Sequence, residues 1–308
     1  MRIILVAEES AGLQVLRNLV KSGHEIVATL ASPDRIFEQD ISVWKLAEKL
    51  GVRTIPSLNV TKPEFAKTIA RERIDLILNV HALHVICEEV LAVPRLGAFN
   101  LHPGPLPRYA GLNAPSWALY HGESSHAVTL HKMEAGIDTG AVVYKECFLI
   151  EDTDTAITVY SKCVRHGVPL ITKLIDTLGS DTQSLRLIDQ DLRQRRYFGR
   201  TVPHNGQLSW NQPARAIVNF VRACDFGPFR SPWGHPECAL GNLRLRIVRA
   251  AMTGKTTLAT PGTIVDCHDH SIDVAASDEC VRVSHVEIDG KTTTALQVLS
   301  VGECLTTN

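Results

Sequence analysis

Short apolar runs alternate with amphipathic stretches along the first part of the chain, and this alternation constrains the fold more than any other feature. Three β-branched runs are separated by two stretches with the helical spacing of apolar residues, in the order 2–7, 10–23, 25–30, 40–51 and 75–80. Gly23 and Gly51 follow the last periodic residue of the two helical stretches, as a left-handed C-terminal cap requires. The pattern predicts an α/β fold with a Rossmann-like, doubly wound and mostly parallel sheet.

Further elements are expected to complete this first domain, which we place at residues 1–203. A pair of strands is expected at residues 126–133 and 140–150, followed by a long helix over residues 155–178. The helix carries apolar residues at helical spacing for most of its length. The resulting domain of about two hundred residues has an ordinary size.

The pattern of apolar and polar residues changes after residue 201. A polar bridge leads to a short predicted helix over residues 214–224, and residues 240–303 form short β-branched runs broken by Gly, Asn and Asp. Many short strands with frequent turn residues are typical of small β-barrels. We therefore expect a smaller, β-barrel-like (OB-like) second domain over residues 204–308.

Composition and charge point to no particular class of partner. The chain has 308 residues, of which 44% are hydrophobic and 21% charged, and its net charge is −1. This balance gives no global field that would attract nucleic acid or an anionic membrane. The first apolar run is too short for a signal segment, and the eight cysteines form no CxxC pair, so we expect a cytoplasmic protein with reduced thiols.

Two polar residues stand at the end of one predicted strand. In a strand over residues 97–102, Asn100 and His102 share one face because successive side chains alternate. Pro103 and the prolines and glycines that follow it stop the strand at once, since proline fixes its own φ and donates no hydrogen bond. The pair therefore lies at the carboxyl edge of the sheet, where doubly wound proteins bind ligands.

Common motifs of such sheets are missing. The first strand-to-helix turn, AEESAG, lacks the G-x-G-x-x-G that a dinucleotide needs, and neither a phosphate-binding P-loop nor a G-x-S-x-G motif occurs. A third polar candidate is Asp138, which lies between Gly136 and Gly140 in a predicted loop. Taken singly, a turn aspartate, a strand-end asparagine and a lone histidine are ordinary structural residues.

Together, however, these motifs resemble a known family. The segments FNLHPGPLPRYAG and VTLHKMEAGIDTGAVV are similar to the 10-formyltetrahydrofolate-dependent formyltransferases, which include methionyl-tRNA formyltransferase, glycinamide ribonucleotide transformylase and enzymes that formylate amino sugars. The segments FGRTVPHNGQLSW, PARAIVNFVRA and PGTIV resemble the two-domain, methionyl-tRNA-formyltransferase-like branch. The loop PLPRYAGLNAPSWAL is similar to the formylation domains of peptide synthetases.

The resemblance implies an enzyme that moves a formyl group from 10-formyltetrahydrofolate to a primary amine. The catalytic Asn, His and Asp of the family fall on Asn100, His102 and Asp138. Amine attack on the formyl carbon gives a tetrahedral intermediate with a negative oxygen, which Asn100 and His102 can stabilise by donating hydrogen bonds. Asp138 can hold the imidazole in its working state and relay the proton that the amine loses. This chemistry requires no metal.

The resemblance also places the pterin ring of the donor on backbone groups of the segment HALHVI. The residues that it brings near the donor are Leu83, His84, Val85, Ile86, Gly136 and Ile137. A rival interpretation takes His81, His84 and Cys87 as metal ligands, but this mixed set has no fourth ligand nearby. The side chains of CHDH, residues 267–270, are expected to diverge, so we predict no metal site.

One basic cluster stands near the end of the first domain. It interleaves arginines with aromatic residues, namely Arg193, Arg195, Arg196, Tyr197, Phe198 and Arg200. A nucleic-acid patch is one interpretation of such a cluster. A solvated domain junction is the other, and we favour it because a few charges near a linker are common.

The acceptor is expected to be a small-molecule amine: an amino acid, a carrier-bound aminoacyl group or a nucleotide-linked amino sugar. Arg108 and Tyr109 lie in the loop after His102 and are candidate acceptor contacts, although both could equally be plain surface residues. We expect no nucleic-acid or membrane partner. The tRNA-acting members carry a basic insertion after the second strand, whereas residues 31–44 here are short and acidic.

Three alternatives stay open at this point. Methionyl-tRNA formyltransferase is the nearest, and it is disfavoured because residues 204–308 contain 9 Lys and Arg against 10 Asp and Glu. A hydrolase of 10-formyltetrahydrofolate would use the same three residues with water as the nucleophile. A non-catalytic folate-binding protein would keep the fold without turnover.

Overall fold

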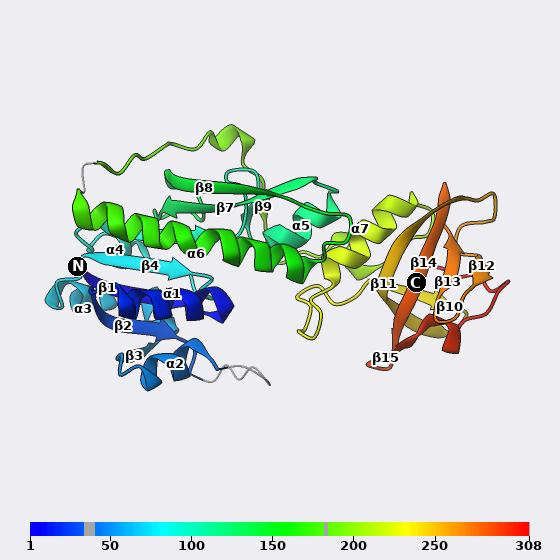
Figure 1. Ribbon diagram of the computed structural model, residues 1–308, viewed down its shortest axis with the longest axis horizontal. Helices are drawn as coiled ribbons and strands as arrows, with labels where there is room; N and C mark the ends of the chain where they lie inside the picture. The colour runs from blue at the N-terminus through cyan, green and yellow to red at the C-terminus, as the bar shows by residue number, and fades with distance from the viewer. Residues whose placement is uncertain (34–40, 182–183, 308) are drawn as a thin grey trace. The chain divides into compact units, whose positions relative to one another are not determined.

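The computed structural model describes residues 1–33, 41–181 and 184–307 (Figure 1). Contacts within the chain divide it into two compact units, which are interleaved in the sequence. The first unit consists of Met1–Gly111, Ala127–Phe148 and Ser161–Tyr197, and the second of Leu112–His126, Leu149–Tyr160 and Phe198–Asn308. The domain boundary expected at residue 203 stays a prediction. Half of the expected acidic segment after the second strand, residues 34–40 of 31–44, lies outside the described residues.

The central sheet has the predicted, mostly parallel architecture. Its strands lie in the order β3-β2-β1-β4-β5-β7-β8, and β1 to β5 are parallel to one another while β7 runs antiparallel to β5. The strands span Arg2–Ala7 (β1), Glu25–Ala31 (β2), Thr54–Pro56 (β3), Leu76–Val80 (β4), Gly97–His102 (β5), Ser125–Lys132 (β7) and Val142–Leu149 (β8). Each predicted strand is therefore confirmed.

Helices connect these strands, among them the three that the periodicity predicts at residues 10–23, 40–51 and 155–178. They span Glu9–Lys21 (α1), Val43–Lys49 (α2), Phe65–Arg71 (α3), Glu88–Leu91 (α4), Ala114–Tyr120 (α5) and Ala156–Ser180 (α6), with a short 3-10 helix at Ser57–Thr61 (η1). Gly23 and Gly51 have φ of 73° and 70°, which confirms the two left-handed caps. Within the described residues, no helix combines the length and the apolarity that crossing a bilayer requires.

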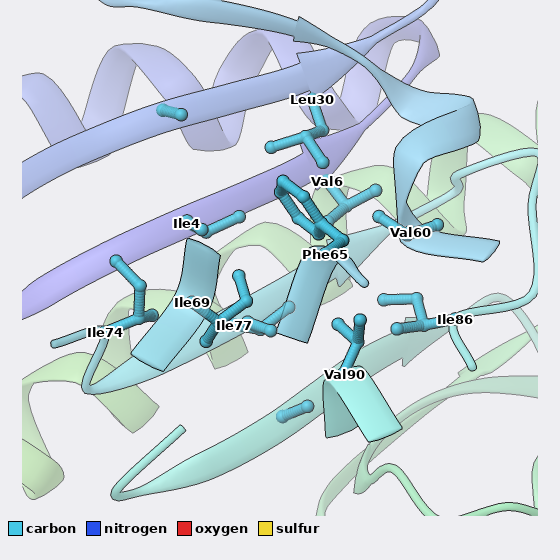
Figure 2. Close-up of a cluster of buried hydrophobic side chains, with 12 residues drawn as sticks. Ile4, Val6, Leu30, Val60, Phe65, Ile69, Ile74, Ile77, Ile86 and Val90 are labelled. Atoms are coloured by element: carbon cyan, nitrogen blue, oxygen red, sulfur yellow. The ribbon is translucent and has the colours of Figure 1, made fainter. Parts of the chain in front are cut away.

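A continuous apolar core fixes the strands of the first unit (Figure 2). Ile4 and Val6 of β1 and Ile77 of β4 pack in one cluster with Phe65 and Ile69 of α3. Burying each such side chain contributes about 1.5–3 kcal/mol, so the cluster holds the helix on the sheet without specific polar bonds. The strand ends that follow this core are thereby held in a constant register.

Chain direction changes sharply where β5 ends. Pro103 and Pro105 prevent further ladder bonds after His102, as predicted. The chain then forms the short strand β6 (Ala110–Gly111), which pairs with β9 (Tyr197–Phe198). The Ala110 N–H donates to the Arg196 carbonyl at 3.0 Å. The loop after the predicted catalytic histidine is therefore tied at its far end to a segment that follows α6.

The second unit contains the predicted helix and a β-rich sheet. The helix α7 spans Ala214–Cys224, and an antiparallel sheet is formed by β10 (Glu237–Leu240), β11 (Leu243–Thr256), β12 (Ile264–Cys267), β13 (Ile272–Ala275), β14 (Glu279–Ile288) and β15 (Lys291–Thr294). Both ends of the strand order β10-β11-β14-β13-β12 are bridged by one C-terminal segment, through Ala239 to Thr306 and Thr263 to Cys304. This closure fits the expected barrel-like domain.

The helix α6 packs tightly against the sheet at Gly167. A Cβ at this position would lie 2.9 Å from Val128 Cγ2 and 3.0 Å from Leu101 Cδ2, both on strands of the site-bearing sheet. We expect Gly167→Leu to lower the free energy of unfolding by about 1–3 kcal/mol, because overpacking forces the helix away. Urea unfolding measures the change.

Gly179→Leu is the matched control, because the nearest atom to its Cβ is in the His24 ring at 3.8 Å, an ordinary contact. Equal destabilisation by the two substitutions would show that the close approach at Gly167 is not a packing constraint.

Candidate active site

The structure brings the three predicted catalytic side chains together at the end of β5. Asn100 Nδ2 lies 3.3 Å from Asp138 Oδ1, and His102 Nδ1 lies 3.5 Å from Asp138 Oδ2. All three residues belong to the first unit, and His102 and Asp138 are buried. The juxtaposition is thus a structural fact, while the catalytic roles of the three residues stay predictions.

A tight turn presents the Asp138 carboxylate. Asp138 has φ of 55°, and the N–H of Gly111 donates to its Oδ2 at 2.8 Å. Gly136 and Gly140 are required by the loop, since a Cβ would lie within 2.3 Å of Thr139 Oγ1 or 2.0 Å of the Lys132 carbonyl oxygen respectively. A larger residue at either glycine would therefore force the loop between β7 and β8 to shift.

The surroundings of Asp138 keep its carboxylate ionised. Burial by itself raises the pKa of this carboxyl, but the charges of His102 and His131, present when their rings are protonated, and the N–H of Gly111 hold the pKa well below its usual range. A negative charge is therefore present in the buried centre of the site at neutral pH.

One hydrogen bond fixes the tautomer of His102. Its Nε2 lies 2.6 Å from the Tyr109 carbonyl oxygen, which can only accept, so Nε2 carries a hydrogen. The neutral ring then has its lone pair on Nδ1, which faces Asp138. The arrangement can take a proton at Nδ1 and stabilise the imidazolium through the carboxylate.

The amide of Asn100 is oriented by two neighbours that the sequence did not reveal. Asn79 Nδ2 donates to Asn100 Oδ1 at 2.9 Å, and Asn100 Nδ2 lies 3.1 Å from His131 Nε2. His131 Nδ1 is 2.8 Å from the Lys132 carbonyl and so carries its hydrogen, which leaves Nε2 as the acceptor. Both N–H groups of Asn100 thus face protein acceptors, through long bonds that a substrate oxygen could replace.

The pairing of residues across the strands indicates these two neighbours of Asn100. Asn79 on β4 is paired with Asn100 on β5, and Asn100 is paired with His131 on β7. Polar side chains therefore stand at matching positions on three adjacent strands. That coincidence would have identified the network once the strand order was known.

The loop after β4, predicted to hold the pterin, exposes apolar side chains. Leu83 and Val85 are 53% and 62% exposed, and Ile137 in the Asp138 loop is 41% exposed. Ile86 is instead buried in the core and anchors the loop. Exposed apolar side chains beside a polar site suit an aromatic ring, so Leu83, Val85 and Ile137 fit the pterin ring of the expected donor. Their contact with the donor stays a prediction.

His81 stands at the start of this loop with φ of 52°. Burial lowers the pKa of His81 to about 4, an effect that Glu9 opposes and His102 adds to. Its Nδ1 lies 3.9 Å from Glu9 Oε2. His81 therefore faces a carboxylate of α1, and its electrostatic coupling to His102 places the loop beside the three predicted catalytic residues.

A different group of possible metal ligands occurs in the second unit. Among the described residues, Asp266, His268 and Asp273 come within 4.8 Å of one another. Of the CHDH segment, His268 alone belongs to this group, and its partners Asp266 and Asp273 come from β12 and β13. The buried Asp273 accepts bonds from Arg282, His268 and Lys255, so cationic side chains already neutralise this carboxylate.

The proposed acceptor contacts have different surroundings. Arg108 is exposed. Tyr109 is only 2% exposed, so the expected stacking of its ring on an acceptor does not fit this structure. The loop looked exposed because it is rich in Pro and Gly, but its tie to β9 turns the ring inward. Tyr109 contributes its backbone carbonyl to His102 instead.

The arginines of the basic cluster have different partners. Arg193 pairs with Asp191 two residues away, whereas Arg195 donates to the Ile137 carbonyl at 2.9 Å and lies over the Tyr197 ring. The interpretation as a plain domain junction therefore misses Arg195, which contacts the Asp138 loop.

Comparison with known proteins decides the family. Residues 1–175 match the family model described as formyl transferase, and residues 200–301 match the model for the formyl transferase C-terminal domain. The chain belongs to the formyl transferase family. The resemblance found in the sequence is thereby confirmed, together with the expectation of an enzyme that takes its formyl group from 10-formyltetrahydrofolate.

Solved structures share the fold of this formyl transferase. A sugar 3N-formyl transferase, WlaRD, solved in the presence of dTDP and 5-N-formyl-THF, has a TM-score of 0.72 at 20% identity over 94% of this chain and 98% of that chain. An N-formyltransferase from Helicobacter canadensis, in complex with folinic acid and dTDP-3-aminofucose, has a TM-score of 0.69 at 17% identity over 92% and 98%.

HypX from Aquifex aeolicus, in complex with tetrahydrofolic acid, has a TM-score of 0.66 at 18% identity over 97% of this chain and 47% of that chain. At these identities the likeness establishes the fold.

Asn79 offers a test of the amide orientation. Asn79→Asp replaces the donor at 2.9 Å from Asn100 Oδ1 by a carboxylate oxygen, which repels Asn100 Oδ1 and favours the flipped amide. We expect kcat of formyl transfer to fall by about 10²-fold or more, the cost of losing one oriented donor. Asn79→Leu keeps the size without the charge and should cost less. Equal kcat values for Asn79→Asp and wild type would contradict this orientation role.

Proposed function

We propose that this formyl transferase moves the formyl group of 10-formyltetrahydrofolate to a primary amine of a small molecule, and that a nucleotide-linked amino sugar is the first candidate. The observation that carries the reaction is the contact of His102 with Asp138, in which Nε2 is committed to a backbone carbonyl and Nδ1 faces the carboxylate. A group so arranged is a base for an attacking amine.

The roles follow from the geometry of the three side chains. His102 accepts the proton of the attacking amine at Nδ1, and the Asp138 carboxylate stabilises the charge that the ring gains. Asn100 supplies an N–H to the oxygen of the tetrahedral intermediate in place of its 3.3 Å bond to Asp138. The proton then passes to the leaving nitrogen of the donor, and the formyl carbon is bonded to the acceptor.

Two considerations support an amino sugar as the acceptor. Sugar N-formyltransferases share this fold over nearly the whole of both chains. The exposed Arg108 follows the catalytic histidine in the loop, and a guanidinium suits the phosphates of a nucleotide. Amino acids and carrier-bound aminoacyl groups are the other small amines, and the acceptor experiment below includes them.

Charge argues against tRNA as the acceptor. Residues 204–308 hold 9 Lys and Arg against 10 Asp and Glu, so counterion release would contribute little to binding. Initiator tRNA that bound tightly and with a steep salt dependence would contradict this part of the proposal.

Substitution of the three site residues tests the reaction. Asn100→Ala, His102→Ala and Asp138→Ala should each lower kcat by about 10²-fold or more, because oxyanion donors and acid–base groups contribute that much. The triple variant should not multiply these losses, since the residues act as a unit. Circular dichroism checks that each variant is folded. Near-normal turnover by Asp138→Ala would exclude the carboxylate from the mechanism.

A mass-spectrometric screen tests the acceptor. Purified protein is given 10-formyltetrahydrofolate with amino acids, carrier-loaded aminoacyl groups, nucleotide amino sugars or initiator tRNA, and we expect the gain of a formyl group on a nucleotide amino sugar. His102→Ala is the matched control for spontaneous formylation. Formate release without any acceptor would favour the hydrolase, and exclusive formylation of charged tRNA would contradict a small acceptor.

A further inference from the structure

Three backbone carbonyls of the Asp138 loop are held by side chains from one distant segment. Gln190 Nε2 donates to the Asp138 carbonyl at 3.0 Å and to the Gly140 carbonyl at 2.6 Å, and Arg195 donates to the Ile137 carbonyl at 2.9 Å. Both donors follow α6, more than fifty positions along the chain from the loop, and all of these residues lie in the first unit.

The two side chains make these bonds at a cost in stability, because each leaves one of its own buried polar atoms unpaired within the described part of the chain. Gln190 Oε1 is buried and has no hydrogen-bond partner among the described residues, as is also true of Arg195 Nε. Leaving a buried polar atom unpaired costs about 1–3 kcal/mol. Gln190 is thus placed so that its N–H groups reach the loop while its oxygen is left unsatisfied, an arrangement that stability alone would disfavour.

We propose that Gln190 and Arg195 are positioning residues that set the Asp138 carboxylate against His102. This inference rests on the proposed formyl transfer for its kinetic consequences, but not for its structural ones. The hydrogen bonds of the two side chains go to backbone carbonyls of the loop, so they act through Asp138 and not on the substrate.

Gln190 and Arg195 hold the carbonyls in the part of the loop that carries Asp138. Asp138 sits at a positive φ outside any helix or strand, and the turn has a bond from Thr139 Oγ1 to the Gly136 carbonyl at 3.0 Å and one at its base from the Lys132 N–H to the Ala141 carbonyl at 2.9 Å. The contact between His102 and Asp138 is already 3.5 Å long. A displacement of about 1 Å in such a site can cost about 10²-fold in rate.

The pH dependence of the site follows from the groups that face Asp138. They are His102 from β5, His131 from β7 and the N–H of Gly111, with the guanidinium of Arg195 on the adjoining carbonyl. The histidines and the N–H keep the pKa of Asp138 low. Loosening the loop weakens them, so this pKa rises toward the ordinary carboxyl range and Asp138 becomes protonated at a higher pH.

The experiment compares Gln190→Ala, Gln190→Glu and Arg195→Ala with two matched controls from the same segment. Gln194→Ala and Arg193→Ala remove side chains of the same types, but these side chains donate to Asp191 and not to the Asp138 loop. We expect kcat to fall about 10–100-fold in the three test variants and less than twofold in the controls. Gln190→Glu should be the most impaired, because its charge faces two carbonyl oxygens.

A split between kcat and KM separates positioning from simple stability. In the test variants kcat should fall with KM unchanged, and Arg195→Lys, which keeps a cationic donor, should restore part of the rate. A lower melting temperature with normal kcat in the folded variants would mean that the two residues are only structural and would overturn the proposal.

A second measurement does not depend on turnover. The Asp138 carboxyl carbon is titrated by ¹³C NMR in the wild type, Gln190→Ala and Gln194→Ala proteins. We expect a raised pKa of Asp138 in Gln190→Ala alone. An unchanged titration overturns the positioning role even if the wild type transfers formyl groups, whereas a raised pKa in a protein that transfers none leaves the positioning intact and overturns the proposed function.

Discussion

The buried Asp138 carboxylate is the constraint on which the rest of the site depends. A charge taken out of water is costly unless ionic and hydrogen-bonding partners surround it. His102, His131, Asn100 and the N–H of Gly111 all point at this group. These partners come from β5, from β7 and from the segment that follows β5, so the carboxylate requires three parts of the chain to meet at one place.

The sheet supplies that meeting place through its strand order. β5 lies between the parallel β4 and the antiparallel β7, so it receives a polar neighbour from each side. The antiparallel register of β7 places His131 opposite Asn100, and the chain leaves β7 one residue later, after Lys132, to form the loop that carries Asp138.

The strands and helices could be predicted because periodicity is local. The runs at residues 2–7 and 97–102 matched β1 and β5 residue for residue, and the three catalytic candidates were found from their family spacing. Asn79, His131 and Gln190 were missed because their roles arise from pairing across strands or from a contact over fifty positions away. The prediction that Tyr109 contacts the acceptor failed for a related reason. Composition suggested an exposed loop, whereas the ring is buried in a loop that pairs with β9.

The hydrogen bonds of the Asn100 amide show how such a site can favour the transition state over the ground state. Its two N–H groups already have acceptors at 3.1 and 3.3 Å, so a neutral formyl oxygen gains little by displacing either of them. As the amine attacks, that oxygen gains negative charge and becomes the stronger acceptor. The exchange therefore becomes favourable only as the reaction proceeds, and binding that strengthens only in the transition state raises kcat without tightening the ground state.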